Sequence, residues 1–86
     1  MKKTTMFTME SCPYCKNARK WMNEVLESDA KYAAIPLTII DEVEEPDLAA
    51  KFDYYYVPTY YLDDVKVHEG AASFEIVKKV FDDALD

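Results

Sequence analysis

The two cysteines of the sequence, Cys12 and Cys15, are separated by Pro13 and Tyr14. A disulfide between them would close so small a loop that it would remove little entropy from the unfolded chain. Small secreted domains held together by disulfides also carry more cysteines than this chain does. The pair is therefore better explained by thiol chemistry than by structural cross-linking. The alternative is that both are small buried apolar side chains without a chemical role.

A metal site is disfavoured by the rest of the sequence. The only histidine, His68, stands far along the chain, and two thiolates with one imidazole do not make a closed zinc ligand set. We therefore expect no bound metal and interpret His68 as an exposed strand-end residue. A metal cluster shared between two chains stays open on these residues alone.

The residues around the cysteines predict a strand followed by a helix. The stretch from Lys3 to Met9 is rich in β-formers, and it ends at Glu10. From Pro13 onward, apolar residues recur every three or four positions, which predicts an amphipathic helix with Ser11 or Cys12 as its N-cap. Proline suits the first helical position. The expected apolar stripe consists of Cys15, Ala18, Met22, Val25 and Leu26, widened by Tyr14 and Trp21.

A position at the start of a helix favours the thiolate form of a cysteine, which is the nucleophilic form. Backbone N–H groups of the first turn point toward the Cys12 sulfur, and the positive end of the helix dipole favours thiolate over thiol. Cys15, one turn further along, can then resolve a mixed disulfide formed at Cys12. Of the nearby charges, Glu10 would raise the pKa of Cys12 and Lys16 would lower it.

The remaining chain alternates between strand and helix patterns. Residues 35–40 form a nearly continuous apolar run, which predicts a central parallel strand buried on both faces. Pro46 opens a short helix with Leu48, Ala49 and Phe52 on its apolar side. Residues 57–62 and 65–68 predict a hairpin that turns at Asp63-Asp64, and Ser73 can cap a last helix. The fold class is therefore α/β, in one domain over residues 1–86, with a mixed four-stranded sheet covered by three helices.

The composition excludes several classes of function. The formal net charge of −7 gives no electrostatic attraction to nucleic acid or to anionic lipid. No apolar run approaches the roughly 18 residues that span a bilayer. Lys2 and Lys3 are not followed by the apolar core of a signal peptide. We expect a cytoplasmic protein.

Two segments resemble a known family. Cys12-Pro13-Tyr14-Cys15 is similar to the active-site motif of glutaredoxins, and Val57-Pro58-Thr59 looks like the cis-proline segment that glutaredoxins share with thioredoxins. The resemblance implies a thioredoxin fold of order β-α-β-α-β-β-α over nearly the whole chain. It further implies that Pro58 is cis, and that Val57 offers its backbone to an extended ligand in a groove with Tyr14 and Thr59.

The chain departs from the glutaredoxin pattern at two places. After the hairpin it has Gly70-Ala71-Ala72-Ser73, where glutaredoxins commonly place a glycine pair and an acid that hold glutathione. Ser73 and its helix N-terminus can still receive a carboxylate. Before the cysteines it has Met9-Glu10-Ser11 and no basic residue. Pro13, Gly70 and Ser73 are further candidate substrate-binding residues, and the electron donor stays open between glutathione and a flavoprotein disulfide reductase.

We therefore expect a monomeric thiol–disulfide oxidoreductase with no tightly bound cofactor. Its partners would be disulfide-containing proteins, with glutathione as a possible co-substrate. The alternatives are a redox-active binding or sensor module, or a domain with no redox function. Five tyrosines flank Pro58 in the sequence: Tyr54, Tyr55, Tyr56, Tyr60 and Tyr61. Their side chains either pack in the sheet or line a groove that binds a partner.

Overall fold

The computed structural model describes all residues, 1–86. Four strands form one mixed sheet: β1 (Thr4–Thr8), β2 (Leu37–Asp41), β3 (Thr59–Leu62) and β4 (Val65–Glu69). The helices are α1 (Pro13–Ser28), the 3-10 helix η1 (Ala30–Ala34), α2 (Pro46–Ala49) and α3 (Phe74–Ala84). The order of strands in the sheet is β2-β1-β3-β4. β1 runs parallel to β2 and antiparallel to β3, and β3 runs antiparallel to β4. The predicted fold class and element order are confirmed, with η1 as an addition.

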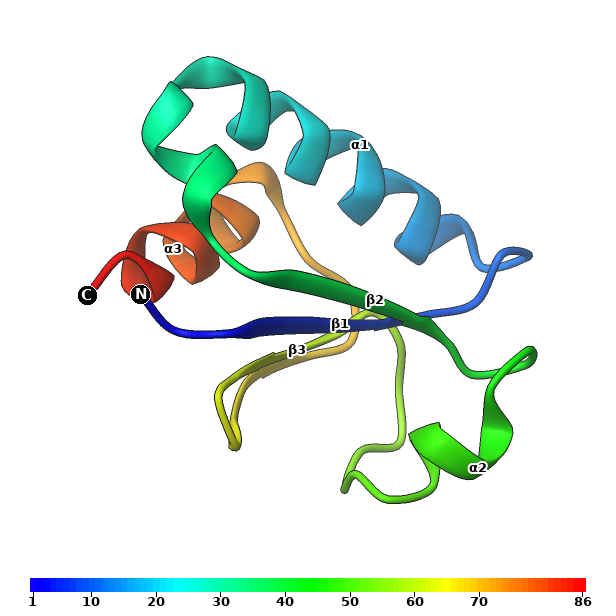
Figure 1. Ribbon diagram of the computed structural model, residues 1–86. Coiled ribbons are helices and arrows are strands. Elements are labelled where there is room, and N and C mark those ends of the chain that lie inside the picture. The colour runs from blue at the N-terminus through cyan, green and yellow to red at the C-terminus, as the bar shows by residue number, and fades with distance from the viewer.

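The sheet separates two apolar clusters of unequal size. Figure 1 shows α1 and α3 on one face of the sheet and α2 on the other. The larger cluster joins the first face to α1, η1 and α3 and includes Met6, Met22, Tyr60 and Phe81. The smaller cluster lies on the α2 side and consists of Phe7, Ile40, Ala49 and Tyr61, with Phe52, Tyr54 and Val57 packed against it. The second cluster connects the sheet to the segment that precedes Pro58.

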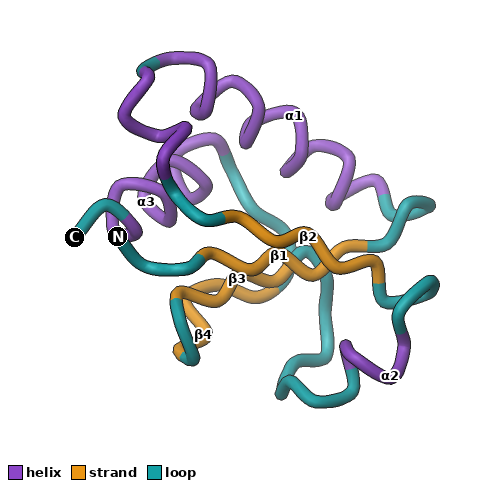
Figure 2. The backbone as a smooth tube through the Cα atoms, viewed as in Figure 1, coloured by secondary structure: helices purple, strands orange, loops and turns teal.

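The prediction for residues 35–40 is wrong in one respect. β2 is parallel to β1 as expected, but it is the edge strand, and β1 takes the centre of the sheet (Figure 2). Thr38 and Ile39 are consequently exposed, Ile39 by 45%. The β-branched run reflects strand propensity, which an edge strand satisfies as well as a central one. The strand also begins at Leu37, after Pro36.

Several predicted boundaries shift by a few residues. α2 is only Pro46–Ala49, so Phe52 lies after the helix, and Leu48 is 37% exposed. β3 begins at Thr59, directly after the proline that cannot donate a ladder hydrogen bond. Tyr14, expected on the apolar stripe of α1, is 59% exposed instead. The hairpin and the cap of α3 are confirmed, with the Ile76 N–H donating to Ser73 Oγ at 3.1 Å.

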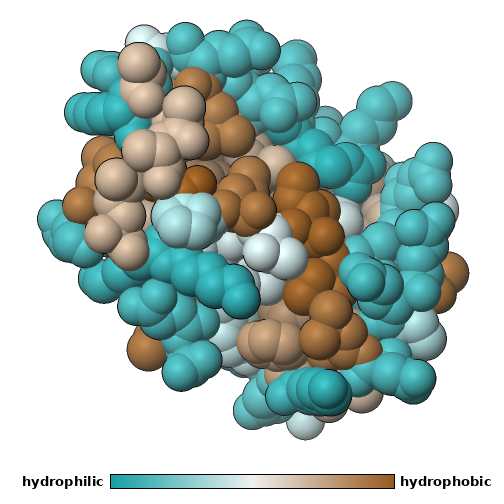
Figure 3. Space-filling model, viewed as in Figure 1, coloured by the Kyte–Doolittle hydropathy of each residue, from teal (hydrophilic) through white to brown (hydrophobic).

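The surface is mostly hydrophilic on the face seen in Figure 3. Apolar side chains are visible across the middle of that face, in the region where Figure 1 places the edge strand β2. None of the helices combines the length and the apolar character needed to cross a membrane.

Candidate active site

Cys12 occupies the N-cap of α1. Its backbone is extended, with φ −85° and ψ 119°, and Pro13 follows at the start of the helix. The Lys16 N–H donates to the Cys12 carbonyl at 3.0 Å, which closes the first turn. The side chain of Cys12 makes no cap hydrogen bond of the usual kind. Cys12 thus lies at the positive end of the helix dipole, at one of the two N-cap positions that the sequence predicted.

The surroundings of Cys12 lower the pKa of its thiol. Partial burial opposes ionisation, but the nearby N–H and thiol groups of Cys15 and the N–H group of Tyr14 favour the thiolate, and so does the positive charge of Arg19. The net effect is a pKa below the ordinary thiol value. Sequence reasoning considered Lys16 as the cation and missed Arg19. The signal was available, since Arg19 lies four residues after Cys15 on the same helix.

The surroundings of Cys15 have the opposite effect and raise the pKa of its thiol. Cys15 has no exposed surface, whereas Cys12 keeps 9% of its surface exposed. Burial is the largest cause of a raised pKa at Cys15, and the neighbouring Cys12 raises it further. The Thr8 hydroxyl and the Met9 N–H act on this pKa in the other direction. The pair is thus asymmetric, with one thiol prepared to ionise and one held as the neutral donor.

The structure brings the cis-proline segment against the first cysteine. The Val57–Pro58 peptide bond is cis, as the family resemblance implied. The Cys12 thiol donates to the Val57 carbonyl oxygen over 3.9 Å, although the two residues are 45 positions apart in the chain. Pro58 and Thr59 are buried, and the Thr59 hydroxyl donates to the Tyr56 carbonyl. The backbone of Val57 therefore borders the reactive sulfur.

Gly70 and Ser73 have different positions relative to this segment. The Gly70 N–H donates to the Pro58 carbonyl at 2.9 Å, so Gly70 supports the cis-proline segment. Its φ of +92° is a conformation that favours glycine. The Ser73 hydroxyl is used within α3, where it accepts from the Ile76 N–H. A ligand carboxylate at that helix start would compete with the cap.

The tyrosines divide between the two interpretations that the sequence left open. Tyr60 and Tyr61 are buried in the sheet, and the Tyr61 hydroxyl donates to the Asp53 carbonyl at 2.7 Å. Tyr54 is half-buried and stacks on Phe7 with ring centroids 4.7 Å apart. Tyr55 and Tyr56 are 86% and 70% exposed. The last two, together with Tyr14, are the aromatic side chains available to a ligand.

Sequence reasoning also missed Glu69, at the end of β4. Its Oε2 atom accepts the N–H groups of Tyr55 and Tyr56 at 2.5 and 3.0 Å. Its Oε1 atom accepts from Lys66 Nζ at 2.7 Å. Lys66 and the two backbone N–H groups lower the pKa of Glu69 to about 2. One carboxylate thus fastens the segment before Pro58 to the edge of the sheet.

Glu69→Gln should remove a pH-dependent contribution to stability. A carboxyl pKa of about 2 in the folded protein lies below the ordinary value of about 4.3. The charged form therefore stabilises the fold above that ordinary value, and the contribution is lost as pH falls toward 2. Thermal unfolding between pH 7 and pH 2 should show the variant less stable at pH 7, with the gap closing on acidification. Glu24→Gln, on the exposed side of α1, is the control; equal curves for Glu69→Gln and wild type would contradict the assignment.

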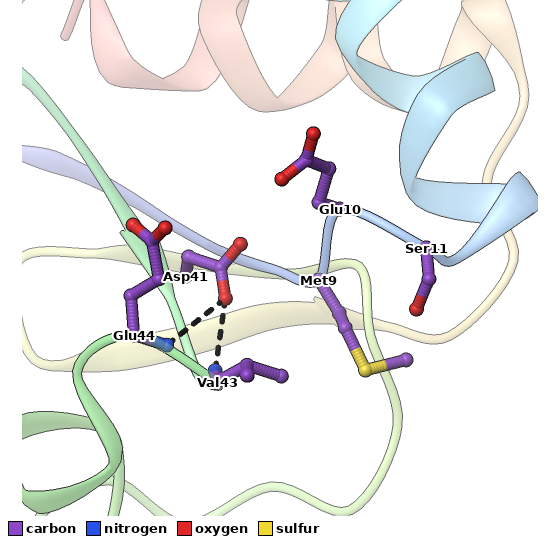
Figure 4. A pocket seen from close by; sticks show the side chains of 6 residues that line it. All are labelled: Met9, Glu10, Ser11, Asp41, Val43 and Glu44. Atoms are coloured by element: carbon purple, nitrogen blue, oxygen red, sulfur yellow. Dashed lines mark hydrogen bonds between the residues drawn. The ribbon is translucent and has the colours of Figure 1, made fainter.

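An acidic hollow lies beside the turn that leads to Cys12. It has a volume of about 450 Å³ and is lined by Met9, Glu10, Ser11, Asp41, Val43 and Glu44. Figure 4 shows the carboxylates around it, with Asp41 Oδ1 accepting the N–H groups of Val43 and Glu44 at 2.8 and 3.3 Å. No cluster of three or more side chains from His, Cys, Asp or Glu is arranged to hold a metal ion. The approach to Cys12 from this side is therefore negatively charged.

Comparison with known proteins assigns the family. Residues 2–82 match the thioredoxin domain family, so the chain belongs to that family. Its structure is similar to that of oxidised thioredoxin from Plasmodium falciparum, with a TM-score of 0.73 and 19% identity over 96% of this chain and 80% of that one. It is also similar to an uncharacterised thioredoxin-like protein from Clostridium perfringens, with a TM-score of 0.69 and 24% identity over 98% and 71% of the two chains. A comparison with curated protein sequences finds no match. The fold with its two adjacent cysteines indicates a thiol redox function.

Proposed function

We propose that this protein is a thiol–disulfide oxidoreductase that reduces disulfides of protein partners. The observation that carries the proposal is the placement of Cys12, which combines a helix N-cap, a lowered pKa and contact with the Val57 carbonyl beside a cis-proline. At that point the nucleophilic thiolate lies beside a stretch of backbone to which an extended substrate can bind.

The reaction proceeds in two exchanges. The Cys12 thiolate attacks one sulfur of the partner disulfide, forms a mixed disulfide and releases the other sulfur as a thiolate. Cys15 then gives its proton to that thiolate and attacks the Cys12 sulfur, which releases the second partner thiolate. Two electrons pass from the cysteines to the partner, and a Cys12–Cys15 disulfide remains.

The backbone beside Cys12 suits an extended segment of a partner. The Val57 carbonyl borders the Cys12 sulfur, and Tyr14, Tyr55 and Tyr56, which are near Cys12 or Val57 in the sequence, have exposed aromatic side chains. Aromatic side chains of this kind are enriched at protein interfaces because they add contact area at low entropic cost. This arrangement supports a protein disulfide as the substrate rather than a small-molecule disulfide alone.

The charges near Cys12 favour a protein as electron donor. Glu10, Asp41 and Glu44 line the adjacent hollow, and they repel glutathione, whose carboxylates give it a net negative charge. Ser73, the remaining candidate for binding a glutathione carboxylate, already caps α3. We therefore propose a flavoprotein disulfide reductase as the donor, with glutathione as the competing candidate.

A coupled assay tests both parts of the proposal. NADPH consumption is followed with insulin as the disulfide substrate, once with thioredoxin reductase and once with glutathione and glutathione reductase. We expect turnover in the first system and little in the second. Turnover only with glutathione would overturn the donor. No turnover in either system, together with no reduction of insulin by the stoichiometric reduced protein, would overturn the function.

A further inference from the structure

An irregularity in the pairing of β3 with β4 decides the face on which Glu69 lies. The register shifts between Tyr60 and Tyr61, so that Val67 of β4 is an extra residue without a partner. In a regular strand, residues three positions apart lie on opposite faces of the sheet. The extra residue instead brings Lys66 and Glu69 onto the same face. Bulges of this kind redirect side chains near active sites.

The shared face is the one on the α2 side of the sheet. Lys66 pairs with Tyr61, which belongs to the smaller apolar cluster, and paired residues of antiparallel strands share a face. Lys66 Nζ lies 2.7 Å from Glu69 Oε1. The second carboxylate oxygen, Oε2, accepts the N–H groups of Tyr55 and Tyr56. The bulge therefore places a carboxylate, already paired with a cation, against the backbone of the segment before the cis-proline.

The hydrogen bonds of Glu69 leave one free backbone donor between Tyr55 and Pro58. The first two N–H groups, those of Tyr55 and Tyr56, are taken by Glu69. Pro58 has no N–H group. The Val57 N–H, which lies between them, has no hydrogen-bond partner within the chain. An extended ligand that adds as a strand needs a free backbone donor, and in this stretch only Val57 provides one.

We propose that Glu69 is a positioning residue that directs an extended partner segment to the Val57 backbone, beside the Cys12 sulfur. The proposal rests on the proposed function. Glu69 acts by occupying the Tyr55 and Tyr56 N–H groups, which would otherwise allow the partner to pair one or two residues too early. It exchanges neither protons nor electrons with the substrate.

The geometry of a strand shows why such an error in register matters. A shift of one residue moves a paired strand by about 3.3 Å along its axis. The reacting atoms of an exchange have to approach to about 3–3.5 Å, and misplacement by about 1 Å already slows a reaction strongly. A partner that paired with Tyr56 instead of Val57 would therefore hold its disulfide out of reach of Cys12.

Glu69→Ala separates the binding of a protein disulfide from the chemistry of Cys12. With thioredoxin reductase as the donor, we expect the KM for insulin to rise by about tenfold, the size expected when hydrogen bonds to a charged group are lost. The first exchange with dithiodipyridine, a small neutral disulfide without a peptide backbone, should keep the wild-type rate. Hydrogen exchange at the Tyr55 and Tyr56 amides should become faster. A residue that served stability alone would not separate the two substrates in this way.

Two further variants control the experiment. Glu24→Ala removes the same charge from the exposed side of α1 and should leave the KM for insulin unchanged. Glu69→Gln keeps a neutral acceptor oxygen, so its KM should lie between those of wild type and Glu69→Ala. If circular dichroism shows Glu69→Ala to be unfolded, the same comparison is made with Glu69→Gln, for which we expect a smaller rise in the KM for insulin.

The outcomes distinguish this proposal from the proposed function. Equal KM values for insulin in wild type and the folded Glu69 variants would overturn the positioning role while wild-type turnover continued. Equal slowing of the reactions with insulin and with dithiodipyridine would overturn it as well, because the change would then act on Cys12 itself. A wild-type protein that reduced neither disulfide would overturn the proposed function instead.

Discussion

Replacing Cys12 by serine should reduce insulin reduction to the rate of the uncatalysed exchange. A serine hydroxyl is not ionised near neutral pH, so the hydrogen bonds that lower the pKa of Cys12 have no anion to stabilise in the variant. Cys15 cannot take over the attack, because it is fully buried and its pKa is raised. The measurement is NADPH consumption with the preferred reductase, with circular dichroism to establish that the variant is folded.

Cys15→Ser is the matched control for that variant. It retains the nucleophile, so it should perform the first exchange and accumulate a mixed disulfide between Cys12 and the partner. That species is detectable by mass spectrometry and should disappear on reduction. Residual turnover in Cys12→Ser comparable to wild type, or a trapped partner attached to Cys15, would contradict the assigned roles.

The pKa of Cys12 separates an oxidoreductase from the alternatives considered for this sequence. The rate of alkylation by iodoacetamide follows the thiolate fraction, so its pH profile should have a midpoint below the value of about 8.5 for a free cysteine. Cys15 should react only when the protein is unfolded. A midpoint at or above the free value, with slow alkylation at neutral pH, would favour a sensor module or a domain without redox function.

The parts of the site that are local in sequence could be predicted from it. The position of Cys12 at a helix start follows from a strand pattern, a proline and an amphipathic repeat within a short stretch, and the structure places it at the N-cap. Val57 and Pro58 were placed by resemblance alone. Only about 5–6% of X–Pro bonds in folded proteins are cis, so local sequence gives no basis for a cis bond.

The parts that depend on distant contacts could not be predicted. Glu69 accepts hydrogen bonds from backbone N–H groups 13 and 14 positions away. The sequence shows only a charged residue at the end of a strand and gives no sign of these bonds. Arg19 and Thr8 meet because α1 folds back over the end of β1. The edge position of β2 was missed for a related reason. Whether a β-branched run is central depends on how many strands pair with it, and its own residues do not carry that information.

Phe7 connects the fold to the substrate-binding segment. It is fully buried in the smaller cluster, with ring centroids 4.7 Å from Phe52, 4.7 Å from Tyr54 and 5.7 Å from Tyr61. Val57 packs against the same cluster. The segment from Phe52 to Val57 has no regular secondary structure of its own. It is held by these aromatic contacts, by the Glu69 carboxylate, and by the Tyr61 and Thr59 hydroxyls, which donate to backbone carbonyls of the segment.

Phe7→Ala should therefore lower both stability and the affinity for substrate. Removing a buried phenylalanine costs about 3–5 kcal/mol, a large share of the roughly 5–15 kcal/mol that stabilises a small domain. Phe81→Ala is the matched control, because Phe81 is equally buried but belongs to α3 and packs in the larger cluster. Urea denaturation should show similar losses for both variants. At a temperature where both are folded, only Phe7→Ala should raise the KM for insulin and speed hydrogen exchange at the Tyr55 and Tyr56 amides. Equal KM values in the two variants would show that the smaller cluster does not hold the substrate-binding segment.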